Sequence, residues 1–235
     1  MLRSLDDLDK GFLKARKKAK KECREQLELL RELIYDIKPL TRTFVLLGEP
    51  QKQFNSLVFW NYLNFVRNCG YTLFLTYNSL YRNAFDSIRH ILESIVQALY
   101  LESRHPSATM KTKIHILSEV QDKHEYHVQS LIEKLDISDK ERIKDIYRSL
   151  SKRIHPTTRT VKSIFEDFLA KDELPTVINC REISDITVYL RDVIDVFFFL
   201  YISHFPERKE QLKKDVKLNE YVRKYTPYLT SKALK

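Results

Sequence analysis

Apolar residues recur at helical spacing between Gly70 and Pro106, in a stretch with no other glycine or proline. They follow two adjoining lines, at Leu73, Tyr77, Leu80, Ala84, Ile88, Ile91, Ile95 and Ala98, and at Tyr81, Phe85, Ile88, Leu92, Val96 and Leu99. An apolar surface this wide is typical of a central helix that has neighbours on several sides. The pattern therefore predicts one long helix over residues 71–104, with Gly70 as the break before it.

A line of polar residues runs along the same predicted helix. Its members are Arg82, Asp86, Arg89, His90, Glu93 and Gln97. Steps of three and four residues put these side chains on one face. Because unpaired buried charge is costly, the face needs partners or solvent. It is either a solvated face or salt-bridge ladder, or one wall of a functional site.

The rest of the chain has the same helical character. Helices are predicted over residues 2–38, 53–68, 108–135, 139–154, 161–169 and 183–202. Ser138, followed three residues later by Glu141, is typical of a capping box before the 139–154 helix. Only three glycines and seven prolines occur in 235 residues, whereas turn-rich β architectures use far more. The predicted fold class is all-α.

Helix-breaking residues divide the chain into three predicted segments. Pro39, Gly48 and Pro50 mark a hinge after the first helix, and Pro206 interrupts the last long one. We expect residues 1–50 to form a basic, coiled-coil-like helical arm and residues 51–205 a helical bundle. Residues 206–235 are expected to form a basic C-terminal extension.

The charge balance raises the question of a polyanionic partner. Lysine and arginine number 41 against 32 acidic residues, for a formal net charge of +9. In the N-terminal arm the lysines that could contact phosphates are Lys14, Lys17, Lys18, Lys20 and Lys21. The alternative is a solvated basic face on a helix that packs on the body or on a dimer mate. A membrane-surface helix is a third interpretation, although the alanine-rich middle offers little to bury in lipid.

The three cysteines, Cys23, Cys69 and Cys180, lie far apart and show no C-x-x-C spacing. This pattern argues against a disulfide framework and favours a reducing, cytoplasmic setting. No signal-peptide core or membrane span is expected, because the most apolar run, residues 196–202, is much too short. The spacing of His, Cys and carboxylate residues predicts no metal site, and no cofactor is expected.

The candidate chemistry lies on the predicted 139–154 helix. Arg148 and His155 are seven residues apart, so they project from the same side about 10 Å apart along the axis. Pro156 ends the helix, which puts His155 at its C-terminus. Histidine can move protons near neutral pH, and arginine offers a planar fork that matches phosphate oxygens. The structural alternative is a helix-end histidine and a surface ion-pair partner.

Two stretches together resemble proteins of the HEPN superfamily. Residues 80–102 (LYRNAFDSIRHILESIVQALYLE) are similar to its second long helix. Residues 147–156 (YRSLSKRIHP) resemble its later helix, which carries an Arg and a His separated by four to six residues. Here six residues separate Arg148 from His155, and Ser149 stands where a polar residue, often Asn, follows the Arg. The resemblance covers about residues 53–205 and implies a HEPN-like helical bundle.

The resemblance also implies a function. Arg148 and His155 would form the catalytic pair of a metal-independent endoribonuclease of a toxin–antitoxin or antiviral defence system. Glu93 on the earlier helix would orient the arginine, with Asp86 as second choice. Lys152 and Arg153, beside the pair, would join the arm lysines in binding nucleic acid.

The partners expected are RNA or another nucleic acid, a second copy of the chain, and a protein such as an antitoxin or defence subunit. The homodimer is also suggested by residues 197–201 and the region around Trp60, which hold more apolar surface than one small bundle should hide. The alternative function is a non-catalytic helical module that binds nucleic acid or a protein partner.

Overall fold

The computed structural model describes residues 5–40, 43–44, 54–120, 127–155, 178–226 and 228–235. Within these residues the chain is helical and contains no strand, so the all-α prediction is confirmed. The helices are α1 (Leu5–Glu22), α2 (Arg24–Tyr35), α5 (Leu57–Tyr77), α6 (Tyr81–Arg104), α7 (Met110–Val120), α8 (Val128–Lys134), α9 (Lys140–Ile154), α11 (Cys180–His204), the short 3₁₀ helix η2 (Pro206–Arg208), α12 (Lys209–Lys214), α13 (Val216–Tyr225) and α14 (Leu229–Leu234).

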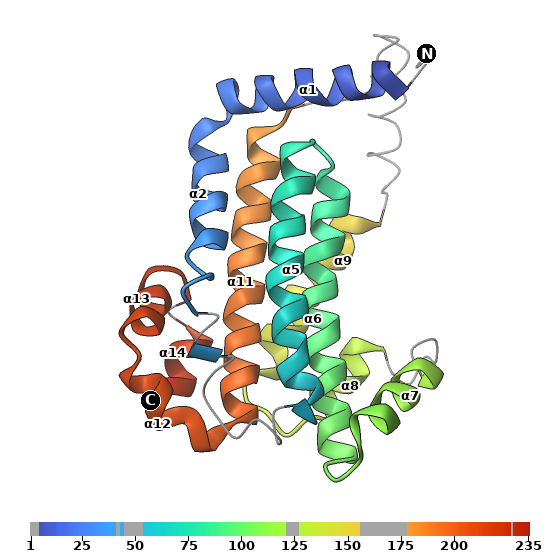
Figure 1. The fold of residues 1–235 in the computed structure, drawn as a ribbon, viewed down its shortest axis with the longest axis vertical. Coiled ribbons are helices and arrows are strands. Elements are labelled where there is room, and N and C mark those ends of the chain that lie inside the picture. Colours follow the sequence, from blue (N-terminus) through green and yellow to red (C-terminus); the bar gives the residue numbers. More distant parts are fainter. Residues whose placement is uncertain (1–4, 41–42, 45–53, 121–126, 156–177, 227) are drawn as a thin grey trace.

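Helix α6 occupies the central position that its apolar lines predict. It packs against α5, α11, α9 and α8, and Ile88, Ile91 and Ile95 are fully buried. Figure 1 shows α5, α6 and α11 running side by side, with α2 along the outer side of α11 and α1 lying across one end of the bundle. The hydrophobic core is continuous from α2 to α14, so it crosses the predicted segment boundaries near residues 50 and 205.

The break before the central helix is not at Gly70. Helix α5 continues through Gly70, which is exposed, to Tyr77, and the chain turns at Asn78–Leu80 with Ser79 at φ 60°. A glycine inside a helix costs only about 1 kcal/mol, which the buried face of α5 outweighs. The prediction that one helix starts at Tyr71 is therefore wrong, and α6 starts at Tyr81.

The first predicted helix is bent into two. α1 and α2 meet at Cys23, and Figure 1 shows them running in different directions. The predicted 108–135 helix is also two, α7 and α8. The capping box before α9 is wrong, because Asp139 is the N-cap in a left-handed conformation and Ser138 donates its hydroxyl hydrogen bond to the Asp139 carboxylate at 2.7 Å. The predicted helix over 161–169 lies outside the described residues.

Residues 197–201, one of the two reasons for expecting a dimer, are buried inside the single chain. Helix α11 is covered from several sides by α6, α2, α14 and α5. The second reason for expecting a dimer, the apolar region around Trp60, still applies, because Trp60 and Leu63 on α5 are exposed. No helix among the described residues has both the length and the apolar character needed to cross a membrane.

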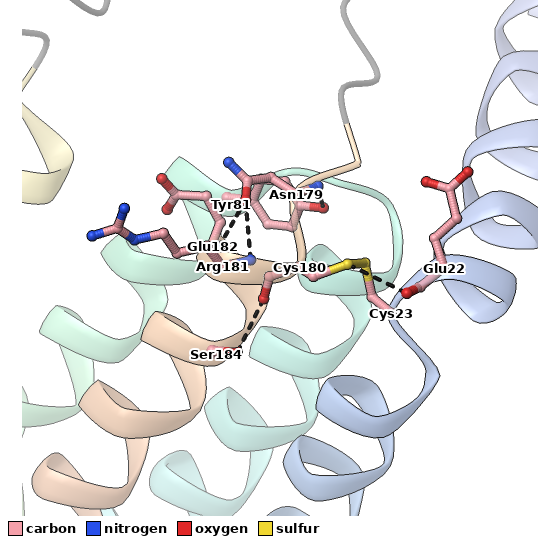
Figure 2. Close-up of a disulfide and its surroundings, with 8 residues drawn as sticks. All are labelled: Glu22, Cys23, Tyr81, Asn179, Cys180, Arg181, Glu182 and Ser184. Carbon is pink, nitrogen blue, oxygen red and sulfur yellow. Dashed lines mark hydrogen bonds between the residues drawn. A yellow bond between two sulfur atoms is a disulfide. The ribbon is translucent and has the colours of Figure 1, made fainter.

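A disulfide joins Cys23 to Cys180, 157 residues later in the chain (Figure 2). Its Cα atoms are 5.2 Å apart, and it ties the α1–α2 corner to the first turn of α11. The expectation of unpaired cysteines was therefore wrong, because distance along the sequence does not measure distance in the fold. The argument for a reducing setting loses this support. Cys69 is free and buried.

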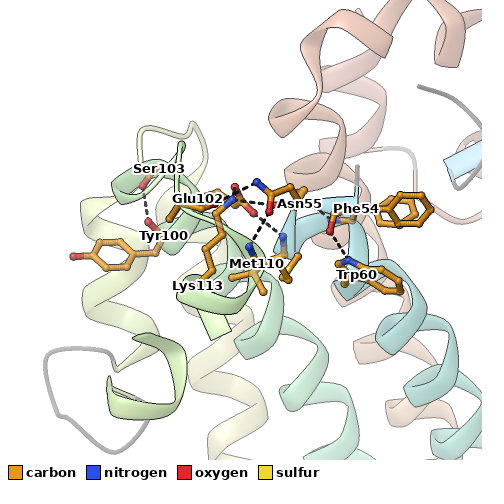
Figure 3. Close-up of polar contacts among 12 residues, drawn as sticks. Phe54, Asn55, Trp60, Tyr100, Glu102, Ser103, Met110 and Lys113 are labelled. Atoms are coloured by element: carbon orange, nitrogen blue, oxygen red, sulfur yellow. Dashed lines mark hydrogen bonds and ion pairs between the residues drawn. The ribbon is translucent and has the colours of Figure 1, made fainter. Parts of the chain in front are cut away.

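A buried ion pair fixes the opposite end of the bundle (Figure 3). The Lys113 ammonium of α7 donates to the Glu102 carboxylate of α6 at 2.7 Å and to the backbone carbonyl of Asn55 at 2.8 Å. The other Glu102 oxygen accepts the backbone N–H of Leu57, the first residue of α5, at 2.6 Å. The side chains of Lys113 and Glu102 are only 1% and 7% exposed, so each charge depends on the other for compensation.

Replacing Cys180 by Ser is expected to lower the free energy of unfolding by about 2–4 kcal/mol, because the open chain gains conformational entropy when it unfolds. Cys180 is less buried than Cys23, so this change disturbs packing least. Chemical unfolding with and without reductant measures the effect. Under reductant the variant and the wild type should agree, and a difference that persists there would contradict this account.

Replacing Lys113 by Met should destabilise the fold by about 3–5 kcal/mol, because it leaves the Glu102 carboxylate buried without its partner. The double variant Glu102→Gln/Lys113→Met should be less destabilised, because Gln still accepts from Leu57 without carrying a charge. Urea unfolding measures both. Lys111→Met, an exposed change on the same helix, is the matched control and should have little effect.

Candidate functional site

Helix α9 presents the candidate catalytic residues on its outer side. Its apolar stripe is buried, at Ile143, Ile146, Tyr147, Leu150 and Ile154. Because this stripe faces the body, Arg148 and His155 are both exposed, as expected from their positions on the helix. Both side chains are therefore accessible from solvent.

Arg148 is held by exposed carboxylates of its own helix. Its Nη1 donates to Asp145 at 2.8 Å and lies 4.0 Å from a Glu141 oxygen. The arginine side chain is 44% exposed, and both acids are more exposed still. Ion pairs of this kind contribute about 0–1 kcal/mol. The guanidinium can therefore exchange these carboxylates for a phosphate at low cost.

His155 is the C-cap of α9. Its backbone N–H donates to the Ser151 carbonyl at 3.1 Å, and its ψ of 126° turns the chain out of the helix. The side chain is exposed, so the imidazole is not a core residue. Residues 156–177, which follow it, lie outside the described part of the chain.

Glu93 contacts α9 one residue away from Arg148. The Tyr147 hydroxyl donates to the Glu93 carboxylate at 3.1 Å, and the Arg89 Nε lies 3.3 Å from the same oxygen. Arg89 also pairs with Asp86 at 3.1 Å. Part of the polar line on α6 is thus a structural ladder that meets α9 at Tyr147. The role of Glu93 in orienting Arg148 stays a prediction.

Tyr147 belongs to the buried stripe of α9 and also makes a polar contact that was not predicted from the sequence. Burial raises its pKa to about 12, and the neighbouring Glu93 carboxylate adds to this effect. The His127 ring meets the Tyr147 ring edge to face at 5.9 Å. A tyrosine at a stripe position opposite a glutamate on the neighbouring helix was the available signal for this contact.

Arg153 ties α9 to two other helices. Its guanidinium pairs with Asp185 and Glu182 in the first turns of α11, and it lies 5.5 Å from the Phe85 ring of α6. Any contact with nucleic acid would have to compete with these carboxylates. Lys152, its neighbour, is exposed.

Helix α1 packs against the helical bundle through its small residues. Ala15 and Ala19 are buried, while Lys14, Lys17, Lys18, Lys20 and Lys21 are exposed. The Arg16 Nε donates to Asn78 at 2.8 Å, which anchors the helix to the turn after α5. Among the residues that the structure describes, no carboxylate lies within ion-pair distance of Lys17, Lys18 or Lys21.

The basic helix and His155 lie at the same end of the bundle. There α6 and α11 begin and α5 and α9 end, and Figure 1 shows α1 lying across this end. Three contacts fix the arrangement: the disulfide, the hydrogen bond from the Asn179 N–H to the Tyr81 hydroxyl at 3.1 Å, and the Arg153 pairs. Sequence alone did not predict it, because residues 14–21 and 155 are far apart along the chain.

No group of three His, Cys, Asp or Glu residues lies close enough to hold a metal ion in the parts of the chain described above. Comparison with known proteins finds no match to a protein-family model, a curated protein or a solved structure.

Replacing Tyr147 by Phe should cost about 1 kcal/mol of unfolding free energy at about pH 8, the net value of one hydrogen bond. The folded-state pKa of Tyr147, about 12, exceeds the value of about 10 in an unfolded chain. The protonated phenol therefore stabilises the fold below about pH 10, and this contribution is lost as the pH rises towards 12. The difference between wild type and variant should shrink at alkaline pH.

Urea unfolding at about pH 8 and about pH 11 measures that difference. Tyr71→Phe is the matched control, because Tyr71 is exposed and its replacement should change stability little at either pH. A cost of Tyr147→Phe that stays constant or grows with pH would contradict the interpretation.

Proposed function

We propose that this protein is a HEPN-like, metal-independent endoribonuclease in which His155 and Arg148 act on one phosphodiester. The observation that carries the proposal is the exposed Arg148–His155 side of α9, which ends at the same end of the bundle as the basic helix α1. The resemblance of residues 80–102 and 147–156 to that superfamily supports the same conclusion.

The chemistry needs a proton acceptor and a cation. RNA carries its own nucleophile, the 2′ hydroxyl, whose proton the His155 imidazole accepts as the oxygen attacks phosphorus. The bond from phosphorus to the 5′ oxygen breaks, and the imidazolium returns the proton to that leaving oxygen. Arg148 stabilises the charge that gathers on the phosphate oxygens. The products are a 2′,3′-cyclic phosphate and a 5′ hydroxyl.

Helix α1 supports this function as a surface for the RNA backbone. Its lysines face solvent, and their positive charge attracts a polyanion at a distance. When the lysines contact the phosphates, the nucleic acid releases its bound counterions, which favours binding. In this proposal the strand lies along α1 while one phosphodiester reaches α9. A dimer would pair two such sites, and its interface would include the exposed residues Trp60 and Leu63 of α5.

The second candidate is a non-catalytic module that binds nucleic acid through α1. It is favoured by one observation, the pairing of Arg148 with Asp145 and Glu141, which a purely structural arginine would also make. The two candidates share the binding surface and differ only in whether His155 is needed.

Replacing His155 by Ala is expected to lower the rate of RNA cleavage at least about 100-fold, the usual contribution of a general acid or base. Arg148→Lys should also lose RNA cleavage, because lysine keeps the positive charge but lacks the planar fork that binds two phosphate oxygens. The assay is purified protein on a mixed RNA pool in the presence of a chelator, with analysis of the product ends for cyclic phosphate.

Two matched controls come from the same chain. His105 is also an exposed histidine at a helix C-cap, that of α6, and Arg104 is an exposed arginine in the last turn of that helix, at the opposite end of the bundle. His105→Ala and Arg104→Lys should cut RNA as the wild type does. Equal cleavage by wild type and His155→Ala, or RNA binding without cleavage by the wild type, leaves the binding module as the better account.

A further inference from the structure

A groove lies between the α1–α2 corner and the end of α5. Its volume is about 530 Å³, within the usual range for small-molecule sites. The residues that line it are Lys20, Arg24, Leu27, Glu28, Arg31 and Tyr77. None of them belongs to the Arg148–His155 pair, so the groove is a separate feature of the molecule.

The charge inside the groove is positive. Its one lining carboxylate, Glu28, already accepts from the Arg31 Nε at 2.6 Å. Lys20 and Arg24 are exposed, and the described residues supply neither with a carboxylate within ion-pair distance. Two cations therefore remain for a ligand, which favours an anion.

The groove also has an aromatic wall. Tyr77 packs against Ala19, Cys23 and Leu27 while it lines the groove, so its ring is supported from behind. The Lys20 ammonium is 6.0 Å from the ring centroid, at the outer limit of a cation–π contact. The lysine is thus held weakly, and it can turn to a phosphate without losing a strong interaction.

The aromatic wall continues along α5 beyond the groove. Tyr71 and Phe74 are each more than half exposed, and their rings are nearly parallel with centroids 6.2 Å apart. The Arg16 guanidinium lies 5.9 Å from the centroid of the Phe74 ring, much as the Lys20 ammonium lies 6.0 Å from that of Tyr77. Two rings three residues apart on α5, Phe74 and Tyr77, are therefore each paired with a cation of α1, and Arg24 lines the groove beside the second pair.

We propose that this groove binds a nucleotide of single-stranded nucleic acid, with the base against Tyr77 and the adjoining phosphates on Lys20 and Arg24. Phe74 and Tyr71 carry the next bases. A line of aromatic rings beside a line of cations is the arrangement by which proteins bind single strands, because rings stack on any base and cations follow the backbone. The net charge of +9 favours such a polyanion over a second copy of the chain.

The proposal shares its ligand class with the proposed function but does not need cleavage. The test therefore uses a probe that cannot be cut, a fluorescein-labelled single-stranded 2′-O-methyl oligouridine, with the full chain and fluorescence anisotropy. Tyr77→Leu should weaken binding about 5- to 150-fold, the range for losing one base–aromatic stack, whereas Tyr77→Phe should bind within about twofold of wild type. Circular dichroism confirms that each variant is folded.

The cation line is tested by the salt dependence of the same binding. Lys20→Gln/Arg24→Gln should reduce the slope of log K against log salt by roughly 1.4, about 0.7 for each lost contact with a single strand. The matched control is Lys111→Gln/Arg223→Gln, which removes two exposed charges from α7 and α13 and should keep the wild-type slope. Because all four side chains are exposed, these variants remain folded.

The outcomes separate this proposal from the proposed function. Absence of binding by the wild type, unchanged binding by Tyr77→Leu, an equal loss in the control double variant, or preference for a duplex over the single strand overturns the groove proposal, whatever the cleavage assay gives. Groove-dependent binding together with equal RNA cleavage by wild type and His155→Ala keeps the groove and removes only the ribonuclease.

Discussion

The structure depends on covering the apolar surface of α11. From Val193 to Ile202 its residues are buried on every side, including Asp195. Phe197 stacks on Phe65 of α5 with ring centroids 4.1 Å apart, and Phe198 stacks on Phe44 at 5.0 Å. A helix that is apolar all round must be enclosed by others. This requirement brings α2, α5, α6 and α14 to one core, although they come from both ends of the chain.

Buried polar groups then fix where the covering helices sit. The Asp195 carboxylate accepts the backbone N–H groups of Leu229 and Thr230 at 2.9 and 2.8 Å, which anchors the start of α14 to α11. The Glu102 carboxylate likewise accepts the backbone N–H of Leu57, at the start of α5, and the ammonium of Lys113, on α7. Because an unpaired buried charge is costly, each contact selects one position of its helix among those that hydrophobic packing alone would allow.

A core enclosed in this way leaves function to the outer faces and the helix ends. The end that carries α1 combines lysines that face solvent, a groove with a tyrosine wall, and a histidine at the C-terminus of α9. The disulfide and Arg153 hold these parts together, since they connect α1, α9 and α11. The proposed binding and cleavage of RNA require such proximity, because one strand must reach both the cations and the Arg148–His155 pair.

Much of the fold was determined by the sequence alone. Helical spacing of apolar residues and scarcity of glycine predicted an all-α chain and the central place of α6, and Pro156 predicted that His155 stands at the end of α9. Such patterns are local, and the 3.6-residue period carries them. Only the tertiary structure decided that Cys23 meets Cys180, that Glu93 meets Tyr147, and that α1 shares an end of the bundle with His155. Contacts between distant segments depend on how helices pack, and the period of a single helix shows which face is buried but not which segments cover it.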